Sequence, residues 1–560
     1  MRELVSLPSH LLSLSCRRWC PCPTDRRRTP TPCSRRWSWC SQTAHVLPRE
    51  MSPPNCSSPL STGRGRSFED AVAALNSLQS NVEYLKSVKN KPVATQEDKF
   101  SFSKQCAEMV GVGPNELSNL SVIHVAGTKG KGSTSAYCES ILRHNGYRTG
   151  FFSSPHLVSV RERICINGKP LSPHKFSKYF WRIYDPLQEK KDPECGMPAY
   201  FAFLTLMAFR VFLEEQVEVA VIEVGIGGEY DTTNILQNTS VVGVTSLGID
   251  HTALLGNTLS SISWQKAGIF KPSAVGYTVS GQSPEALRVL GERSVERKCP
   301  LAIAPSLGQY TWPDAESKQT VHSFLPTQQL NVSLALQLTN AWMMRNGRSI
   351  SDFKVSAPSL CLEEAPPFTV SRKTAEGILK CRWPGRIQIL NSDCGHIKYF
   401  LDGAHTVESM LSCVEWYMKN RPSSPTVRHA LLLNMTGDRD RLQIIEPLFP
   451  CKFDKVVFCP NIVHSPAPQA ELSNFQLSQN SQLKQSQNLC ELWISGRDQQ
   501  SGNGGRGCSV PETSLKSCVN EALSELGNVD GEWSVLVTGS LHLVGAVLSV
   551  LDPNLEKSMS

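Results

Sequence analysis

The sequence predicts an α/β protein with two domains, each built around a mostly parallel sheet. Short apolar runs alternate with segments of helical spacing, which is the pattern of βαβ units. The runs are almost continuously apolar, as strands covered by helices on both faces require. A first series begins at Ser121, and a second, smaller series begins after a rigid turn at residues 383–385.

The first domain opens with a helix that precedes the alternating series, because apolar residues recur at helical spacing over residues 68–85. An apolar strand then leads into a glycine-rich turn and a helix that ends at Asn145 and Gly146. The expected elements after the first helix are a strand at 122–126, a helix at 133–144, a strand at 149–153, a helix at 200–215, and strands at 217–224 and 241–246. Right-handed crossovers between such strands make the sheet parallel.

The second series follows residue 384. Strands are expected at 397–401, 429–433, 455–459 and 534–537, with a helix at 406–419. Between 463 and 515 the composition turns to Ser, Gln, Asn and Gly, which bury too little apolar surface to offset the entropy of ordering. We therefore expect a disordered insertion there. The predicted parts are a leader with a disordered segment at 1–66, a first domain at 67–383, and a second domain at 384–560.

Charge is concentrated at the N-terminus. The chain of 560 residues has a net charge of +7, and residues 1–50 supply +6 of it through nine Arg, no Lys and three acidic residues. Since the rest is nearly neutral, we expect no nucleic-acid partner. The Arg- and Ser-rich, acid-poor leader is typical of a mitochondrial transit peptide, and a disordered basic tail is the alternative. Initiation at Met51 would give a second, cytoplasmic form.

Cysteine content and hydropathy narrow the class of protein further. Twenty Cys among 560 residues are too few for a disulfide scaffold, and no paired C-x-x-C ligands occur at zinc-site spacing, so we expect reduced thiols. The irregular spacing of the Cys in the leader argues against a metal cluster. No apolar stretch reaches the roughly 18 residues of a membrane span. We expect a soluble monomer in the mitochondrial matrix and the cytoplasm, and association with the inner membrane stays open.

A glycine-rich loop between the first strand and its helix is the strongest single motif. It consists of Gly127, Thr128, Lys129, Gly130, Lys131, Gly132 and Ser133. Backbone N–H groups in such a loop and at a helix N-terminus bind phosphate oxygens, and a hydroxyl from Ser133 or Thr134 would suit Mg²⁺. The spacing departs from G-x-x-x-x-G-K-[ST], since Gly132 follows Lys131 directly and Val125 stands where the first Gly would be. We predict a P-loop mononucleotide-binding domain, followed by a Rossmann-like one.

Further motifs follow this loop in a fixed order. They are FFSSPHLV (151–158), VRERI (160–164), EVGIGG (223–228), GIDH (248–251), WQKAGI (264–269), WPGR (383–386), LDGAH (401–405) and VTGS (537–540). In this order the chain resembles the folylpolyglutamate synthase family of the Mur-ligase superfamily, whose members are ATP-dependent amide ligases. The resemblance covers about 68–462 and the last strand, and it leaves out the leader and the insertion.

The resemblance implies a magnesium site at one edge of the first sheet. The family places Mg²⁺ on the positions of Ser153, Glu223 and His251. Each of them follows a strand, and parallel strands bring their carboxyl ends to one edge. A carboxylate facing a phosphate suits Mg²⁺. The alternatives are a Glu223 balanced by a cationic side chain and a purely structural His251. A monovalent cation such as K⁺ is expected alongside.

Four more matched positions have expected roles. Lys266, in small and apolar surroundings, would be a neutral base that takes up CO₂ to become a carbamate. The matching lysine is often carbamylated in this superfamily. The alternative is an ordinary exposed or salt-bridged lysine. Arg386 and Asp402 are expected at ATP, with an interdomain salt bridge and a helix N-cap as the respective alternatives. His405 is expected near the incoming glutamate. Lys131, His405 and Lys266 are thus the predicted catalytic residues.

Two loops complete the expected site. Residues 154–163 resemble the family's loop over the folate, with Arg161 and Arg163 as candidate contacts, and a solvated charged stretch is the alternative. Residues 225–234 resemble the loop that closes over the nucleotide. Thr406 stands where bacterial relatives tend to have Asn, which leaves the fine contacts to glutamate open.

The implied reaction joins L-glutamate to tetrahydrofolate and its polyglutamates through γ-linked amides, with ATP as the activating substrate. An acyl phosphate would form first, because phosphorylation turns a carboxylate oxygen into a good leaving group. Retention of the more anionic folates for one-carbon metabolism would follow. The alternatives are a dihydrofolate synthase, which adds the first glutamate to dihydropteroate, and a P-loop ATPase switch.

Overall fold

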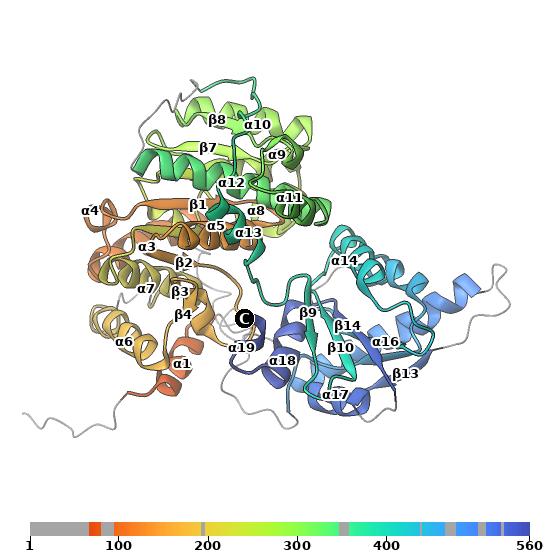
Figure 1. The fold of residues 1–560 in the computed structure, drawn as a ribbon. Coiled ribbons are helices and arrows are strands. Elements are labelled where there is room, and N and C mark those ends of the chain that lie inside the picture. The colour runs from red at the N-terminus through yellow and green to blue at the C-terminus, as the bar shows by residue number, and fades with distance from the viewer. Residues whose placement is uncertain are drawn as a thin grey trace, which may run out of the picture. The chain divides into compact units, whose positions relative to one another are not determined.

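Two β-sheets form the framework of residues 64–560 in the computed structural model (Figure 1). The structure describes residues 66–79, 95–191, 196–346, 358–436, 440–464, 478–501, 511–527 and 531–559. The leader predicted at 1–66, apart from Arg66, and Met51 lie outside the described residues. Strands of the first sheet end at residue 303 and those of the second begin at residue 388. Because residues 64–560 form one compact unit, the domain boundary at 384 stays a prediction.

The first sheet has eight strands in the order β4-β3-β2-β5-β1-β6-β7-β8. They are β1 (Val122–Ala126), β2 (Thr149–Phe152), β3 (Ile164–Ile166), β4 (Lys169–Pro170), β5 (Val219–Glu223), β6 (Val241–Val244), β7 (Val275–Thr278) and β8 (Leu301–Ile303). The central strand β1 pairs in parallel with β5 and β6, whereas β3 and β4 form an antiparallel hairpin at one edge. The parallel strands therefore end at one edge, where the predicted ligand-binding motifs follow them.

Helices cover both faces of this sheet (Figure 1). One core contains α1 (Phe68–Asn76), α3 (Gln96–Met109), α6 (Pro173–Glu189) and α7 (Tyr200–Glu214), and the other contains α5 (Lys131–His144), α12 (Pro326–Asn346) and α13 (Arg372–Leu379). Val122 of β1 belongs to the first core, whereas Ile123 and Val125 belong to the second. Side chains of a strand alternate between its faces, so a sheet covered on both faces requires apolar strands throughout.

The remaining helices around the first sheet lie between these elements in sequence. They are α4 (Pro114–Leu117), α8 (Thr252–Leu255), α9 (Leu259–Lys266), α10 (Pro284–Glu296) and α11 (Ala315–His322), with 3₁₀ turns η1 (Val160–Arg163), η2 (Thr232–Ile235), η3 (Ala267–Ile269) and η4 (Leu307–Gln309). Ser172, Ser283 and Ser371 each accept a hydrogen bond from the first turn of the helix that follows them. These serine caps satisfy backbone N–H groups that have no partner within the helix.

The second sheet has the order β13-β12-β11-β14-β10-β9. Its strands are β9 (Gln388–Asn391), β10 (Ile397–Leu401), β11 (Arg428–Leu433), β12 (Lys455–Phe458), β13 (Glu512–Leu515) and β14 (Trp533–Thr538). One core contains α14 (Val407–Asn420), α15 (Arg441–Ile445), η5 (Glu446–Cys451) and α16 (Gln479–Ser501), the other contains α17 (Val519–Gly527) and α18 (Leu541–Leu551), and α19 (Glu556–Met559) follows. Strands β10, β11, β12, β13 and β14 run parallel to their neighbours in this set, which confirms the predicted α/β class for both sheets.

Most elements agree with their predictions. The strands expected at 122–126 and 397–401 are confirmed to the residue, and the other expected strands agree to within two residues. The helix expected at 68–85 ends earlier, at Asn76, and residues 80–94 lie outside the described part of the chain. The helix α12 was not predicted. Its residues 331–339 are all buried. A helix that is buried on every side lacks the helical spacing of apolar and polar residues by which a surface helix is predicted.

The insertion expected to be disordered at 463–515 contains a helix, α16, and an edge strand, β13, so that prediction is wrong for these residues. Leu489 and Trp493, one helical turn apart in α16, are each only 1% exposed. The Trp493 ring lies 4.9 Å from that of Phe449. A few apolar residues on one face suffice to dock a helix whose average composition is polar. Residues 465–477 and 502–510 lie outside the described part of the chain.

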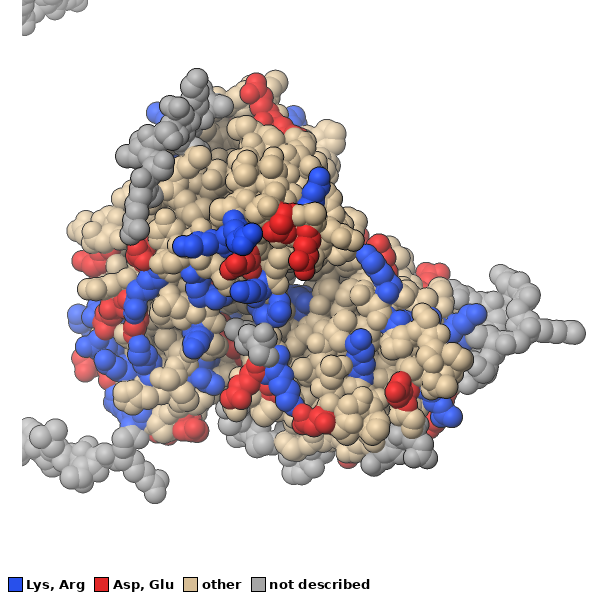
Figure 2. All heavy atoms as spheres, in the orientation of Figure 1, with Lys and Arg blue, Asp and Glu red and all other residues tan. Residues whose placement is uncertain are grey.

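Basic and acidic side chains are interspersed over the face drawn in Figure 2. In the described part of the chain, no helix combines the length and the apolar character that crossing a bilayer requires.

Candidate functional site

The glycine-rich loop connects β1 to α5 at the carboxyl edge of the first sheet. Gly127 has a φ of 147° and Gly130 a φ of 88°, conformations that L side chains rarely adopt. A Cβ at Gly127 would lie 1.8 Å from Thr245 Oγ1, and a Cβ at Gly130 would lie 2.2 Å from Asn331 Oδ1. Gly130 is also the N-cap of α5, where no side chain caps the helix. The first backbone N–H groups of α5 are therefore arranged to receive an anion.

The first half of the loop is anchored to the segment after β6. The N–H groups of Thr128 and Lys129 donate to Ser246 O at 3.0 and 3.1 Å. Lys129 Nζ lies 3.5 Å from Asp250 Oδ2. The ammonium of Lys129 therefore has a carboxylate neighbour, and Lys131 is the better candidate for contact with a phosphate.

The hydroxyl groups at the start of α5 differ in accessibility. Thr134 is buried, and its Oγ1 donates to Asn331 Oδ1 at 3.3 Å. Ser133 is half-buried. Of the two hydroxyls considered for Mg²⁺, that of Ser133 is the more accessible.

Glu223 ends β5 beside the loop. Its carboxylate is buried, and its Oε2 would lie 3.4 Å from a Cβ at Gly132. Burial raises the pKa of Glu223, while Lys131 and the N–H of Ser154, which donates to Oε2 at 3.0 Å, oppose this rise. Strands β2 and β5 pair with Phe152 opposite Ile222, so Ser153 and Glu223 end neighbouring strands side by side. A buried carboxylate requires a cation nearby, and either Lys131 or a metal ion could provide that charge.

Ser153 and Glu223 end neighbouring strands, and His251 follows a strand that lies two positions from β5 in the same sheet. His251 lies beyond the end of β6, on the other side of β1 from β5, and its side chain is exposed. Its backbone is left-handed with a φ of 52° at the start of α8. The described residues contain no group of three or more His, Cys, Asp or Glu side chains that could hold a metal ion. The oxygens of Ser153 and Glu223 nevertheless suit Mg²⁺ in kind.

Lys266 lies at the last residue of α9, against the phosphate loop. Its side chain is 2% exposed, and its Nζ donates to Gly127 O at 2.7 Å. Burial and, to a smaller degree, the charge of Lys131 lower the pKa of Lys266 to about 7, with Asp250 acting in the opposite direction. Lys266 is therefore not an exposed lysine, and near pH 7 a large share of its side chains is neutral.

The turn at 383–386 brings the guanidinium of Arg386 toward the carboxylate of Glu223. Burial lowers the pKa of Arg386, and the charges of Asp402 and Glu223 oppose this effect. Asp402 follows β10 of the second sheet, whereas Glu223 ends β5 of the first. Arg386 thus interacts with one carboxylate from each sheet. Trp383 lies beside the phosphate loop, since its Cζ2 would be 3.2 Å from a Cβ at Gly132.

Asp402 is buried at the mouth of the second sheet. Its Oδ2 accepts a hydrogen bond from Ile387 N at 2.9 Å, and burial raises its pKa against the charge of Arg386. The N-cap of α14 is Thr406 and not Asp402, so the N-cap alternative for Asp402 is wrong. His405 Nδ1 lies 2.7 Å from Gly403 O, which fixes this nitrogen as the donor.

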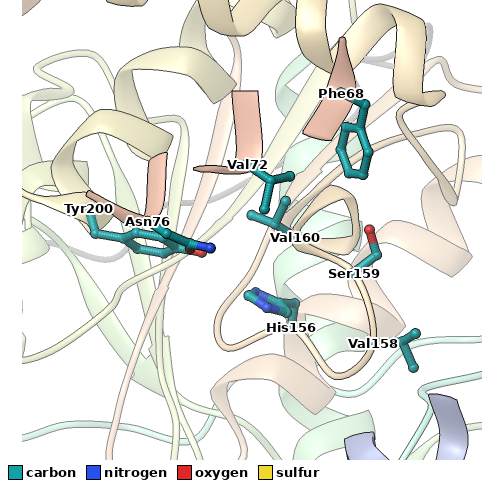
Figure 3. A pocket seen from close by; sticks show the side chains of 8 residues that line it. All are labelled: Phe68, Val72, Asn76, His156, Val158, Ser159, Val160 and Tyr200. Atoms are coloured by element: carbon teal, nitrogen blue, oxygen red, sulfur yellow. The ribbon is translucent and has the colours of Figure 1, made fainter. Parts of the chain in front are cut away.

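A small pocket lies between α1 and the loop expected to cover the folate (Figure 3). It is lined by Phe68, Val72, Asn76, His156, Val158, Ser159, Val160 and Tyr200. Arg163, the last residue of this loop, is buried. Its Nε donates to His156 Nδ1 at 2.9 Å, and its Cζ lies 5.3 Å from the Tyr200 ring centroid. Arg161 instead donates to Leu171 O. The loop is therefore a folded structure with a buried arginine rather than a solvated charged stretch.

Two residues at the site were not predicted as such. Asn331 contacts the phosphate loop from α12, a helix without a motif, and so no sequence signal marked it. His542, at the start of α18, is half-buried, and desolvation together with the charge of Arg163 lowers its pKa to about 4. The motif VTGS ends just before it at the carboxyl edge of β14, and the rule that located Glu223 would also have pointed to His542.

The fold and the loop define a P-loop nucleotide-binding protein with two α/β sheets. Comparison with characterised proteins identifies its relatives. The chain is 40% identical to mitochondrial folylpolyglutamate synthase of Homo sapiens over 550 residues, which cover 88% of this chain and 92% of that protein. It is also 40% identical to the Cricetulus griseus protein of the same name, covering 88% and 93%. The chain belongs to the folylpolyglutamate synthase family.

Solved structures of similar fold agree with this assignment. Escherichia coli FolC in complex with DHPP and ADP superposes with a TM-score of 0.61 at 24% identity, covering 87% of this chain and 98% of that one. The Mycobacterium tuberculosis folylpolyglutamate synthase complexed with ADP and AMPPCP has a TM-score of 0.60 at 23% identity, covering 86% and 99%. At such identities the likeness shows the shared fold. No family model matches the chain.

Proposed function

We propose that this protein uses ATP to add L-glutamate to tetrahydrofolates through γ-linked amide bonds, releasing ADP and phosphate. The observation that carries the proposal is the meeting of Lys131, Glu223 and Arg386 at the uncapped start of α5. An anion site with two cations and a carboxylate suits the transfer of a phosphoryl group. Relatives that share most of the chain's length are named folylpolyglutamate synthase.

In the first step, the terminal γ-carboxylate of the folate attacks the γ-phosphorus of ATP. A carboxylate O–P bond forms, the bond to the β-phosphate oxygen breaks, and ADP leaves. Lys131 and Arg386 stabilise the negative charge on the transferred group. The N–H groups at the start of α5 hold the phosphates in place.

In the second step, the amine of L-glutamate attacks the acyl carbon. The C–N bond forms through a tetrahedral intermediate, inorganic phosphate leaves, and the amine gives up a proton. His405, which follows β10 beside Asp402, is the residue we assign to the incoming glutamate. Burial of the site between segments from both sheets limits hydrolysis of the acyl phosphate.

Mg²⁺ would be held by Ser153 and Glu223, with His251 as the third proposed ligand. The ion would supply charge neutralisation at the phosphates when bound. The buried carboxylate of Glu223 supports this assignment, because burial raises its pKa and a nearby cation favours its ionised form. A K⁺ ion stays a prediction with no side chain assigned to it.

Lys266 would serve as a carbamate. Its buried side chain has a pKa lowered to about 7, so the neutral amine that reacts with CO₂ is abundant at neutral pH. The carbamate would be an additional carboxylate beside the phosphate loop. The alternative is an amine that only binds the Gly127 carbonyl. Labelling with ¹³C-bicarbonate, read by NMR on wild type and Lys266→Met, separates the two: a signal lost in the variant supports the carbamate, and no signal supports the amine.

The folate would lie in the pocket beside the loop at 154–163. Tyr200 and Phe68 offer aromatic surface there, and Arg163 is held beside Tyr200. An aromatic ring system with an anionic tail suits such a lining. The partners are therefore tetrahydrofolate and its polyglutamates, L-glutamate and ATP, and we propose that the protein acts as a monomer.

We also propose that the protein reaches mitochondria. Three relatives carry "mitochondrial" in their names, and the Arg-rich leader is of the matching kind. A cytoplasmic form would arise from initiation at Met51. N-terminal peptides from the two compartments test this: cytoplasmic protein that retains residues before Met51 would refute it.

Two assays distinguish the proposal from its rivals. A dihydrofolate synthase would use dihydropteroate as acceptor, and an ATPase switch would hydrolyse ATP without folate or glutamate. The proposed ligase sustains ADP formation over many turnovers only when tetrahydrofolate and glutamate are both present, and its products gain one glutamate at a time. Sustained ADP formation with glutamate alone, or with tetrahydrofolate alone beyond a single turnover, would contradict it.

A further inference from the structure

Four consecutive residues anchor the loop at 225–234, each to a different place. Thr232 Oγ1 lies 3.4 Å from Ser103 Oγ of α3. Thr233 Oγ1 lies 2.9 Å from His124 Nε2 of β1. Asn234 Nδ2 donates to Gly268 O at 3.1 Å, and Asp231 Oδ2 accepts from Ile226 N at 3.0 Å, within the loop itself. All four residues are buried, and the mechanism above uses none of them.

The proton positions in this network follow from counting donors. Thr233 Oγ1 is 2.6 Å from Asp231 Oδ1 and 2.9 Å from His124 Nε2. A carboxylate only accepts, so the single hydroxyl hydrogen of Thr233 goes to Asp231. His124 Nε2 must therefore carry a hydrogen and donate it to Thr233. His124 Nδ1 is buried and has no hydrogen-bond partner among the described residues, which costs less for a lone pair than for an unmade N–H bond.

His124 thus donates to Thr233 and Thr233 donates to Asp231, which also accepts a hydrogen bond from the backbone N–H of Ile226. His124 is fully buried and neutral, since burial and the charge of Lys271 lower its pKa to about 3. Near neutral pH the His124 ring is therefore uncharged and carries its single hydrogen on Nε2. Thr233 Oγ1 takes part in two hydrogen bonds and the Asp231 carboxylate in three, which leaves little freedom to the loop.

We propose that His124 is a positioning residue for the ATP site, which fixes the backbone at Gly225 and Ile226 through Thr233 and Asp231. His124 is the third of the five residues of β1, and the phosphate loop begins directly after that strand at Gly127. Glu223, the last residue of β5, precedes Gly225 by two positions. Strand β1 thus fixes the position of the phosphate loop through its main chain and the position of Glu223 through the side chain of His124. This inference rests on the proposed function only in assigning Glu223 to ATP.

The test compares full-length variants that remove or retain one hydroxyl. Thr233→Val removes it, Thr233→Ser retains it, and Thr339→Val removes an equally buried hydroxyl that bonds only to its own helix. Loss of one buried hydrogen bond should speed amide exchange at Gly225 and Ile226 about tenfold and raise the KM for ATP about fivefold. Thr233→Ser and Thr339→Val should resemble wild type in both measurements.

A second pair covers the case in which Thr233→Val does not fold. His124→Gln keeps a donor near the Nε2 position, whereas His124→Leu does not. The Leu variant should show the fast exchange and the raised KM, and the Gln variant should restore both toward wild type. Unchanged exchange at Ile226 in the variants without the bond would overturn the proposal. So would an unchanged KM with a kcat that falls only in proportion to the unfolded fraction. If wild type forms no folate product, the proposed function fails, but the exchange data still decide about His124.

Discussion

Lys266 Nζ donates a 2.7 Å hydrogen bond to the carbonyl oxygen of Gly127, the first residue of the phosphate loop. A buried, largely neutral amine thus supports the loop from the side of α9, while Lys131 extends from the other end of the loop. The charge of Lys131 contributes to the low pKa of Lys266. Lys266 is therefore a base at this site whose charge depends on pH.

The pKa of Lys266 predicts how stability changes with pH. In the folded protein it lies at about 7, against 10.5 for an ordinary lysine. Between these values the unfolded chain binds a proton that the folded chain does not, so the free energy of unfolding rises with pH. Below about pH 7 both states are protonated and this contribution is constant. Urea unfolding at pH 7 and pH 9 should show wild type gaining stability relative to Lys266→Met. An unchanged difference between the two proteins would contradict the low pKa.

Arg386 and Asp402 are predicted to act as a unit. Arg386→Ala should lower kcat/KM for ATP by a factor of about 10 to 100, because a charged hydrogen-bonding group at the phosphates is lost. Asp402→Asn should have a smaller effect in the Ala background than in wild type, since the interaction is already gone. Initial rates for the four proteins of this cycle measure the coupling. Strictly additive effects would show that the two residues act independently.

Helix α16 is predicted to be part of the second core. Trp493→Ala should lower the free energy of unfolding by about 3 to 5 kcal/mol, because a large buried side chain leaves a cavity. The neighbouring Ile494 is 47% exposed, and Ile494→Ala should change stability by no more than about 0.5 kcal/mol. Denaturant unfolding of both variants gives the comparison. Equal effects would mean that α16 does not pack as described.

The pocket at Tyr200 is predicted to bind folate and not ATP. Tyr200→Leu removes the ring over which the Arg163 guanidinium lies. It should raise the KM for tetrahydrofolate about tenfold and leave the KM for ATP close to that of wild type. Steady-state kinetics with each substrate varied in turn separates the two effects. A parallel rise in both KM values would point to a general distortion of the site.

The sequence located the strand ends well because a buried strand and the polar residue after it leave a local signal. Glu223 and Asp402 were found in this way, and both are buried next to Arg386. The small and apolar neighbours of Lys266 pointed to a neutral base there but left an exposed lysine open, and the structure shows that the side chain is buried. These inferences needed only residues that are close in sequence.

Contacts across the fold could not be predicted in the same way. Asn331 reaches the phosphate loop from a helix that is buried over most of its length and so shows no periodicity. The bond from His124 to Thr233 joins residues 109 positions apart. The docking of Trp493 was hidden by the polar composition of the insertion. Long-range packing decides each of these cases, and no local pattern reports it.

The central claim is tested most directly by product analysis of the full-length protein. It would be incubated with ATP, Mg²⁺, tetrahydrofolate and labelled L-glutamate, and the folates would be resolved by mass, with Lys131→Ala as the control. We predict a ladder of products that differ by one glutamate each, absent in the control. ATP consumption without any glutamate addition would contradict the ligase and favour an ATPase or a different carboxylate acceptor.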